Sequence, residues 1–394
     1  MKVALVHDYL REYGGAERVL EVLHEIFPEA PLYTAYYNPG GLGENGKRFK
    51  DWDIKTSWFQ YFPFANQLLS PFRIFGPMMF ESFDLSGYDL VISSSATHLA
   101  KSVITKPGTL HISYIHTPPR FLYGYTTSFN YKKRWWTRIG GEIINHVMRM
   151  YDFEVSQRPD ILIANSKNVA SRIKKFYRRE SVVIYPPVSL REALRAGPPI
   201  EIKKFEIRNS KFEIENRKYF LSLGRLVRGK GTEVIVESCT KLGVPLKVAG
   251  SGPELENLKS LAGVSVEFLG WVSDEKRLEL LSGAKALILA SEDEDFGITS
   301  IEAQWMGTPV IAPASGGYLE TVIAEKTGEF YGGPGQVTVE NLLETLKNFD
   351  PDKYKTEDCI KQAQMFSKKR FKEELLKLIK SNLKDPFQPQ GDKD

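Results

Sequence analysis

Cysteine is scarce in this sequence of 394 residues, since only Cys239 and Cys359 are present. Two thiols are too few for a disulfide framework or a zinc site, and they fit a chain that works in the reducing cytosol. Long apolar runs are missing as well, because no stretch reaches the roughly 18 uninterrupted apolar residues of a membrane-spanning helix. The N-terminus turns polar at His7 and Asp8, too soon for the apolar segment of a signal peptide, so we expect no secretion signal.

A strong excess of one charge is also absent, because 53 basic and 49 acidic residues leave a net charge of only +4. So small a surplus does not point to nucleic acid as a partner. At about 150 residues per domain, the length predicts two or three domains that fold without disulfides or metals. What the sequence does contain is a repeated alternation of short apolar runs and amphipathic segments.

The first half of the chain shows this alternation from its start. Val3–Val6 is an apolar run typical of a strand buried on both faces, and a turn with Gly14 and Gly15 leads into a segment of helical periodicity. Further strands are predicted at residues 88–93, 111–115, 161–164 and 182–185. Ser166 stands where the N-cap of the next helix belongs. The pattern predicts a parallel sheet with crossover helices.

A second alternation begins at Tyr219, with strands predicted at residues 220–223, 246–249, 266–269, 286–289 and 309–312. Between the halves, residues 186–218 are rich in proline and contain two near-copies of Lys-Phe-Glu-Ile, which we interpret as one hairpin. Residues 360–383 indicate a charged helix. We therefore expect an N-terminal domain at 1–190, a linker or hairpin at 191–218, a C-terminal domain at 219–365, and at 366–394 a helix that packs back toward the first domain, with a polar tail. Two facing domains of this kind would form a cleft, and open α/β sheets bind ligands at the carboxyl ends of their strands.

Two glutamates supply the most informative candidate site. Glu294 and Glu302 are eight positions apart, with Gly297 between them, where a loop is expected to enter a helix. Carboxylates there accept hydrogen bonds from hydroxyls, while free N–H groups of the first helical turn donate. The spacing suits recognition of a sugar and a ribose. An acidic cap with a solvated helix face gives the same pattern, and both interpretations stay open.

A glycine-rich turn, GRLVRGKG at residues 224–231, follows the first strand of the second alternation. Arg225 and Lys230 are expected to project into the cleft and suit a diphosphate, the arginine as a planar fork and the lysine as a point charge. The turn also matches the P-loop pattern up to its lysine, but Gly231 stands where a hydroxyl would hold magnesium. A nucleotide-hydrolysing P-loop and an ordinary strand–turn–helix remain as alternatives.

Gly14, Gly15 and His116 are candidates in the first domain. Two glycines at a helix start let backbone N–H groups approach a phosphate closely. The pair does not form Gly-x-Gly-x-x-Gly and lacks an acidic ribose partner, which disfavours a dinucleotide oxidoreductase. His116 ends a predicted strand, where its ring can donate to a sugar hydroxyl or help to accommodate positive charge, although a histidine that caps a strand against core is equally common. His7 and His98 are weaker candidates of the same kind.

Together these segments resemble the retaining glycosyltransferases of family 4, or glycosyltransferase group 1, whose GT-B fold consists of two facing Rossmann-like domains. The resemblance covers most of the chain, and its specificity lies in the order and spacing of the segments. They are Gly14-Gly15, Tyr114–Arg120, Ile163–Ser166, Tyr185–Val188, Leu223–Leu226 with Lys230-Gly231, Ala249–Pro253, Phe268–Gly270 and Glu294–Glu302. The segment VHDYLREYGGAERV at residues 6–19 is most similar to mannosyltransferases of polysaccharide assembly. One departure is the pair Arg228-Gly229, where many members carry proline and glutamate.

The resemblance implies a role for each matching residue. The implied catalytic residues are His116 beside the sugar, Glu294 on the sugar hydroxyls, and Arg225 and Lys230 on the leaving diphosphate. The implied donor-binding set is Gly14, Gly15, Arg225, Lys230, Gly250, Trp271, Val272, Glu294, Phe296, Gly297, Ile298 and Glu302, with Glu302 on the ribose and the loop at 271–273 on the base. No metal and no cofactor are expected, because the nucleotide sugar is a substrate and this class needs no bound metal.

Acceptors in this family dock on the first domain, where residues 120–138 combine aromatic and basic side chains. That composition suits a membrane interface and an anionic lipid diphosphate, although a core helix with a solvated basic face gives the same pattern. The candidate acceptor or membrane residues are Arg120, Tyr123, Lys132, Lys133, Arg134, Trp135 and Trp136. Residues 58–64 and 72–83 contain further aromatic side chains and the methionines Met78 and Met79, which also suit a membrane interface.

The sequence thus predicts a retaining, metal-independent hexosyltransferase, with mannose from GDP-mannose favoured. Its expected acceptor is a saccharide on a polyprenyl-diphosphate lipid in cell-surface polysaccharide or glycolipid assembly. We expect a cytoplasmic protein that works as a peripheral enzyme on the inner face of the cell membrane, at an anionic surface, without nucleic acid. The alternatives left open are a non-catalytic nucleotide-sugar-binding protein, a hydrolysing epimerase of similar shape, and a transferase of glucose or N-acetylglucosamine from UDP.

Overall fold

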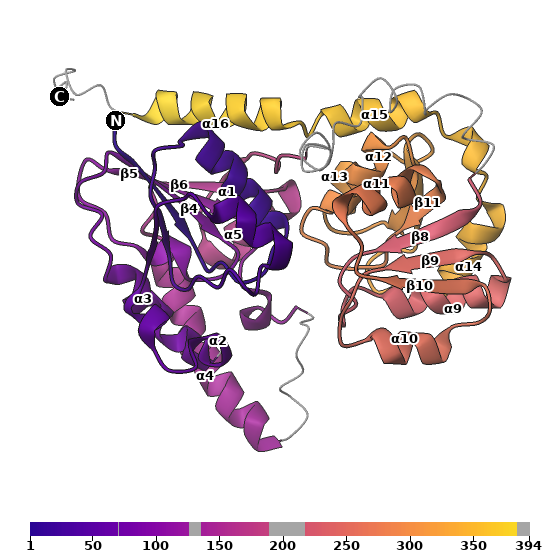
Figure 1. Cartoon of the computed structure of the whole chain (residues 1–394), viewed down its shortest axis with the longest axis horizontal. Helices are drawn as coiled ribbons and strands as arrows, with labels where there is room; N and C mark the ends of the chain where they lie inside the picture. The colour runs from indigo at the N-terminus through magenta and orange to yellow at the C-terminus, as the bar shows by residue number, and fades with distance from the viewer. Residues whose placement is uncertain (70, 126–134, 189–216, 384–394) are drawn as a thin grey trace.

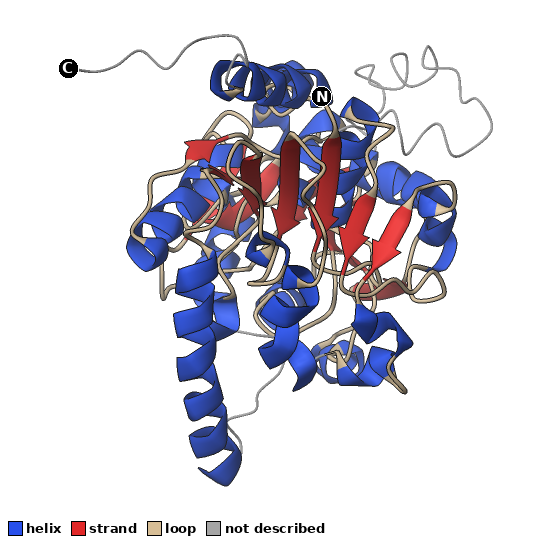
Figure 2. Ribbon diagram, turned by 90° about the vertical axis from the view of Figure 1, so that its left-hand side faces the viewer, coloured by secondary structure: helices blue, strands red, loops and turns tan. Residues whose placement is uncertain are grey.

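The computed structural model of the chain describes residues 1–69, 71–125, 135–188 and 217–383, with backbone only at 71 and 135–139 (Figure 1). It contains a seven-stranded sheet of order β3-β2-β1-β4-β5-β6-β7 and a six-stranded sheet of order β10-β9-β8-β11-β12-β13. Neighbouring strands in both sheets run parallel. Figure 2 shows helices packed around the strands. The predicted α/β class with two Rossmann-like domains is confirmed.

The first sheet consists of β1 (Val3–His7), β2 (Leu32–Thr34), β3 (Ile54–Thr56), β4 (Leu90–Ser95), β5 (Leu110–Ile115), β6 (Ile161–Ala164) and β7 (Val182–Val183). The strands predicted in this half are all present, with ends shifted by one or two residues. β2 and β3 were not predicted, because three residues are too few to establish a period. The strand at 182–185 is shorter than expected and ends at Val183.

The second sheet consists of β8 (Tyr219–Leu223), β9 (Leu246–Ala249), β10 (Val266–Gly270), β11 (Ala284–Ile288), β12 (Val310–Pro313) and β13 (Gly328–Tyr331). All five predicted strands are present. β13 was missed, because its sequence GEFY has a glycine and a glutamate and gives no apolar run. The hairpin interpretation of residues 186–218 falls largely on residues 189–216, which lie outside the described part of the chain.

The helices of the first domain are α1 (Gly15–Ile26), α2 (Ala65–Leu68), α3 (Gly76–Glu81), α4 (Trp135–Val155) and α5 (Lys167–Tyr177). Those of the second are α9 (Thr232–Leu242), α10 (Leu255–Leu261), α11 (Asp274–Ser282), α12 (Ile298–Trp305), α13 (Tyr318–Thr321), α14 (Val339–Asn348) and α15 (Thr356–Gln364). Short 3-10 turns are η1 (Gly43–Phe49), η2 (Trp58–Tyr61), η3 (Pro71–Phe75), η4 (Ala100–Ser102), η5 (Arg120–Leu122) and η7 (Pro351–Lys353). Ser166 caps α5 as predicted, since its hydroxyl accepts the N–H of Val169. Among the described helices, none is long and apolar enough to cross a bilayer.

The predicted single helix at 360–383 is wrong, because the chain forms two helices there, α15 and α16 (Lys368–Asn382). Ser367 separates them, and its hydroxyl accepts the N–H of Arg370 to cap α16. α16 leaves the second domain and lies against α1 of the first (Figure 1). Phe371, Leu375 and Ile379 are buried there in the core that also contains the apolar face of α1. The end of the chain therefore ties the two domains together.

Candidate active site

Lys230 and Glu294, two of the predicted catalytic residues, meet in the second domain. Lys230 lies in the turn between β8 and α9, Glu294 lies in the loop between β11 and α12, and Nζ is 2.7 Å from Oε2. The carboxylate is the more buried partner, with 17% of its side chain exposed against 37% for the lysine. Burial by itself raises the pKa of Glu294, but Lys230 and then Arg120 outweigh it and leave the pKa lowered. Glu294 is therefore a charged acceptor held beside a cation.

Arg225, the other predicted cation, is placed apart from this pair. Its guanidinium reaches across to the first domain and pairs with Glu12 at 3.3 Å, with 71% of its side chain exposed. Gly250 packs under the same turn, because a Cβ on Gly250 would lie 1.8 Å from the carbonyl oxygen of Gly224. The two glycines have φ values of +148° and +152°, respectively. Gly250 thus shapes the backbone that presents Arg225.

Glu302 is buried in α12 and bridges the domains. Its Oε1 accepts from Arg18 of α1 at 2.5 Å and lies 3.3 Å from Arg277 of α11. Burial by itself raises the pKa of Glu302, and Arg277 and Arg18 outweigh it, so the pKa is lowered. Its Oε2 has no hydrogen-bond partner among the described residues. A contact of Glu302 with a ribose stays a prediction. Arg18 was not predicted, since its contact joins residues 284 positions apart.

The Gly14-Gly15 turn lies against the start of α12. A Cβ on Gly15 would come within 2.7 Å of Ile298 Cδ1, so a larger residue here would require the Ile298 side chain to shift. The N–H of Gly14 is occupied, because it donates to Glu17 Oε2 at 2.7 Å. Gly297 caps α12 with φ +88°, a left-handed conformation that favours glycine. The turn and the N-terminus of α12 therefore lie side by side, and the predicted role of Gly14 and Gly15 toward a phosphate stays a prediction.

Phe296, Trp271 and Val272 complete the predicted donor set. The Phe296 side chain is buried against Tyr185 and Phe366, which leaves its backbone to contact a ligand. Val272 packs against the core of the second domain, whereas the Trp271 side chain is 69% exposed. An exposed indole directly after β10 is free to stack on a base.

His116 lies at the end of β5 in the first domain, almost completely buried. Its Nε2 is 2.8 Å from Ser94 Oγ, and its ring packs edge-on against Tyr114. Burial, with a smaller contribution from His7, lowers the pKa of His116 to about 3. The imidazole is therefore neutral, and it can donate or accept a hydrogen bond without carrying charge.

The first domain also holds the loop that carries Glu294, through residues the sequence did not single out for this task. Arg172 and Arg120 pair with Asp295 Oδ1 at 2.6 Å and 2.9 Å. Ser166 donates to the carbonyl oxygen of Asp295 at 2.6 Å. These contacts fix the residue next to Glu294 from the opposite domain. Of these residues, the sequence indicated Ser166 as a helix cap and Arg120 as an acceptor or membrane candidate, whereas Arg172 gave no signal.

Two of the predicted acceptor or membrane residues make contacts inside the protein. Arg120 forms an ion pair with Asp295. Tyr123 stacks on Phe176, and its hydroxyl donates to Asp152 at 2.7 Å. Lys132, Lys133 and Arg134 lie outside the described residues. Trp135 and Trp136 begin α4, but their side chains lie outside the described part. A role of these seven residues toward an acceptor or a membrane stays a prediction.

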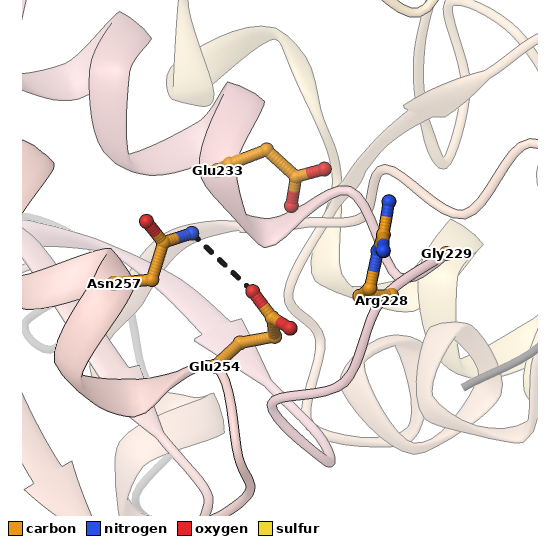
Figure 3. A pocket seen from close by; sticks show the side chains of 5 residues that line it. All are labelled: Arg228, Gly229, Glu233, Glu254 and Asn257. Carbon is orange, nitrogen blue, oxygen red and sulfur yellow. Dashed lines mark hydrogen bonds between the residues drawn. The ribbon is translucent and has the colours of Figure 1, made fainter. Parts of the chain in front are cut away.

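A cavity of about 460 Å³ adjoins the turn of Lys230 in the second domain (Figure 3). Its lining residues are Arg228, Gly229, Glu233, Glu254 and Asn257. Asn257 donates to Glu254 at 3.3 Å, and Glu233 faces the same space. None of the predicted catalytic or donor-binding residues lines this cavity. The candidate site is therefore defined by the contacts of Lys230, Glu294 and Glu302. In the described ranges, no group of three or more His, Cys, Asp or Glu side chains is arranged to hold a metal ion.

Comparison with known proteins shows what the second domain is similar to. Residues 203–366 match the family model described as glycosyl transferases group 1. The match covers less than half of the chain and lies mostly in the C-terminal domain. The matched residues include Arg225, Lys230, Glu294 and Glu302. The match ends before α16 begins.

Two curated relatives are similar to parts of the chain. An uncharacterized glycosyltransferase of Methanocaldococcus jannaschii is 33% identical over 135 residues, which are 32% of this chain and 35% of the relative. The alpha-1,3/1,6-mannosyltransferase ALG2 of Mus musculus is 28% identical over 212 residues, which are 47% of this chain and 49% of the relative. The alignments thus span about a third to a half of these relatives.

The whole fold is similar to that of several solved structures, which include a glycosyltransferase from Rickettsia africae. Anabaena HepE in complex with UDP-glucose superposes with a TM-score of 0.67 at 15% identity, covering 97% of this chain and 100% of HepE. At this identity the likeness establishes the fold. The two domains and their mutual arrangement are those of the GT-B fold.

Proposed function

We propose that the chain is a retaining glycosyltransferase that moves a hexose from a nucleoside diphosphate sugar to a saccharide acceptor. The observation that supports this most directly is the ion pair of Lys230 and Glu294, which lies in the region that matches the model of group 1 glycosyl transferases. In this proposal Lys230 is the fixed cation, and Glu294 beside it is the carboxylate that binds the sugar. His116 and the Gly14-Gly15 turn are supplied by the other domain.

In the proposed reaction, the cationic residues stabilise the leaving diphosphate and the carboxylates bind hydroxyl groups of the donor. Departure of the nucleoside diphosphate develops negative charge on its β-phosphate, and preorganised cations and N–H groups stabilise such charge in the transition state. Lys230, Arg225 and the N-terminus of α12 supply them. Glu294 accepts from hydroxyls of the donor sugar, and Oε2 of Glu302 accepts from the ribose. His116, which is neutral, contacts the sugar without repelling an oxocarbenium-like centre.

For the donor we propose GDP-mannose. The named mannosyltransferase among the relatives supports this choice, whereas HepE was solved with UDP-glucose, which makes a UDP-sugar the competing donor. A panel of GDP- and UDP-sugars decides between them, first by thermal shift and then by product mass. We expect transfer from GDP-mannose in the presence of EDTA, with retention of the anomeric configuration. Stabilisation by the nucleotide without consumption of any donor would instead identify a binding protein.

For the acceptor we propose a lipid-linked saccharide at an anionic membrane. Large apolar side chains are exposed on two parts of the first domain. They are Trp58, Tyr61, Phe62, Phe64, Phe75 and Met78 near η2, α2 and α3, and Ile143, Ile144, Met150, Tyr151 and Phe153 on α4. Figure 1 shows α4 extending away from the sheet of this domain. Exposed apolar groups of this size mark interaction surfaces, and amphipathic helices bind membrane interfaces through them.

Sedimentation with liposomes tests the membrane proposal. We expect wild-type protein to bind anionic vesicles at low salt, and the Met150→Asp/Phe153→Asp variant to lose most of this binding. Val264→Asp is the matched control, because Val264 is an exposed apolar residue of the second domain. The absence of binding by the wild type at low salt would remove the membrane proposal and leave the transferase proposal standing.

A further inference from the structure

A chain of hydrogen bonds runs from the Gly14 turn to His116 inside the first domain. The N–H of Gly14 donates to Glu17 Oε2 at 2.7 Å, and Glu17 Oε1 lies 3.3 Å from His7 Nε2. On the other side of the His7 ring, Nδ1 lies 3.2 Å from Ser94 Oγ. Ser94 Oγ is in turn 2.8 Å from His116 Nε2. Each of these side chains is buried.

The strand register places these groups in line. β1, β4 and β5 are neighbours in the sheet, and His7 is directly opposite Ser94. The backbone N–H of His116 donates to the carbonyl of Ser95 at 2.9 Å, which holds His116 beside the end of β4. The three side chains therefore share one edge of the sheet, where the strands end, and they reach one another without a bend in the backbone.

The direction of the hydrogen bonds follows from the chemistry of the first acceptor. An ionised carboxylate only accepts, so His7 carries its hydrogen on Nε2 and donates to Glu17. In neutral His7, Nδ1 is then an acceptor and receives the hydroxyl hydrogen of Ser94. The oxygen of Ser94 is left to accept from His116, whose hydrogen must be on Nε2. The hydrogen bond that the His116 ring makes to the described residues uses Nε2, which leaves Nδ1 to a ligand or to solvent.

We infer that Glu17, His7 and Ser94 are positioning residues that fix the tautomer of His116, with the hydrogen on Nε2 and the Nδ1 lone pair left as an acceptor. The consequence for catalysis rests on the proposed function. It differs from the sequence expectation that the ring donates to the sugar, since a sugar hydroxyl would donate to Nδ1.

A second histidine in the same sheet provides an internal comparison. Ser93 Oγ is 3.0 Å from Nε2 of His111, so this pair has the same local geometry. Nδ1 of His111 is buried and has no partner among the described residues, and no carboxylate stands behind Ser93 in the contacts described. Substitution of Ser93 therefore removes a similar hydrogen bond without touching the Glu17–His7–Ser94 chain.

Nitrogen NMR of the six histidines tests the inference directly and needs no substrate. In ¹⁵N-histidine-labelled wild type at about pH 8.5, where imidazoles are neutral, we expect His116 to show a protonated Nε2 and an unprotonated Nδ1. His116→Gln assigns the signals. In Ser94→Ala the two nitrogens of His116 should move toward an average of both tautomers, whereas Ser93→Ala should affect His111 and leave His116 unchanged. A protonated Nδ1 in wild type, or an unchanged tautomer in Ser94→Ala, would overturn the inference.

Glu17→Gln provides a second variant in case loss of Ser94 prevents folding. Its amide can donate as well as accept, so it no longer imposes the direction of the chain, and we again expect mixed tautomers. A pure Nε2–H tautomer in folded Glu17→Gln would count against the role of Glu17. With transferase activity in hand, Ser94→Ala should lower kcat on the order of tenfold, the scale of losing an outer hydrogen-bond partner, with an unchanged Kd for the nucleoside diphosphate. The NMR result stands even if the chain transfers no sugar.

Discussion

Lys230 and Glu294 form their ion pair from turns 64 positions apart, and each has a different role in the proposed transfer. The lysine faces developing charge on the leaving group, so Lys230→Ala should lower kcat by about 100-fold or more, or ~3 kcal/mol of barrier. Lys230→Arg keeps the charge and should retain more activity. The measurement is kcat and KM with the preferred donor, with circular dichroism to verify the fold. Lys276→Ala is the control, because Lys276 pairs with Glu279 on an exposed helix surface. Near-normal turnover in Lys230→Ala would refute the assignment.

The lowered pKa of Glu294 has a consequence for stability. A carboxyl group whose pKa is lower in the folded state stabilises that state above its unfolded pKa, for which the ordinary value is 4.5. The contribution is lost as pH falls through the folded pKa. We expect Glu294→Gln to have a lower Tm than wild type at pH 7, with the difference shrinking below about pH 4.5. Thermal unfolding of both proteins from pH 3 to 7 measures it. A difference that grows in acid would contradict the sign.

Individual residues also show where sequence reasoning ends. Glu294, Glu302 and Lys230 could be singled out because a glycine and a predicted strand or helix end lie close to each in the sequence. Their partners could not, since Arg18 and Arg172 reach Glu302 and Asp295 across 284 and 123 positions. A contact between domains leaves no periodic signal along the chain.

At the scale of elements, a buried ion pair anchors α4. Lys101 after β4 and Asp152 of α4 are both fully buried, with Nζ 2.7 Å from Oδ1, and Tyr123 and Tyr177 donate to the same carboxylate. Removing one member leaves the other charge buried without its partner. We therefore expect Asp152→Ala to destabilise the protein by about 3–5 kcal/mol.

Chemical denaturation measures this effect, and a double variant separates its cause. Lys101→Met/Asp152→Leu removes both charges and should regain part of the stability, because an apolar pair of similar volume avoids desolvation. Glu154→Ala is the control on the same helix, since Glu154 is exposed. Equal losses in the control and in Asp152→Ala would show that the buried pair does not anchor α4.

Elements were predictable where a pattern persists over several residues. The buried parallel strands β1, β4, β5, β6, β8, β9, β10, β11 and β12 gave apolar runs, and a serine marked the start of α5. The three-residue strands β2 and β3 gave no period. The break between α15 and α16 was missed, because residues 362–367 contain no glycine or proline that would end a helix, and only the cap at Ser367 shows where the second helix begins.

At the scale of the whole molecule, the two domains are joined by charge as well as by α16. Arg18 with Glu302, Arg48 with Asp274, Arg225 with Glu12, and Arg120 and Arg172 with Asp295 all cross the interface. Glu320 of α13 also accepts from the N–H groups of Lys167 and Asn168 at the start of α5. The sequence predicted two facing domains, but not which side chains hold them together.

Arg172 is the contact through which this arrangement can be tested, because it is buried and pairs with the residue next to Glu294. Arg172→Ala should favour a more open arrangement, so the radius of gyration from X-ray scattering should increase in the absence of donor. If closure becomes harder by ~1.4 kcal/mol, the KM for the donor should rise about tenfold. Hydrogen exchange at residues 293–297 should become faster. Lys174→Ala on the same helix is the control, since Lys174 is exposed and pairs with Glu180 within the first domain. An unchanged radius together with an unchanged KM would mean that closure does not depend on this arginine.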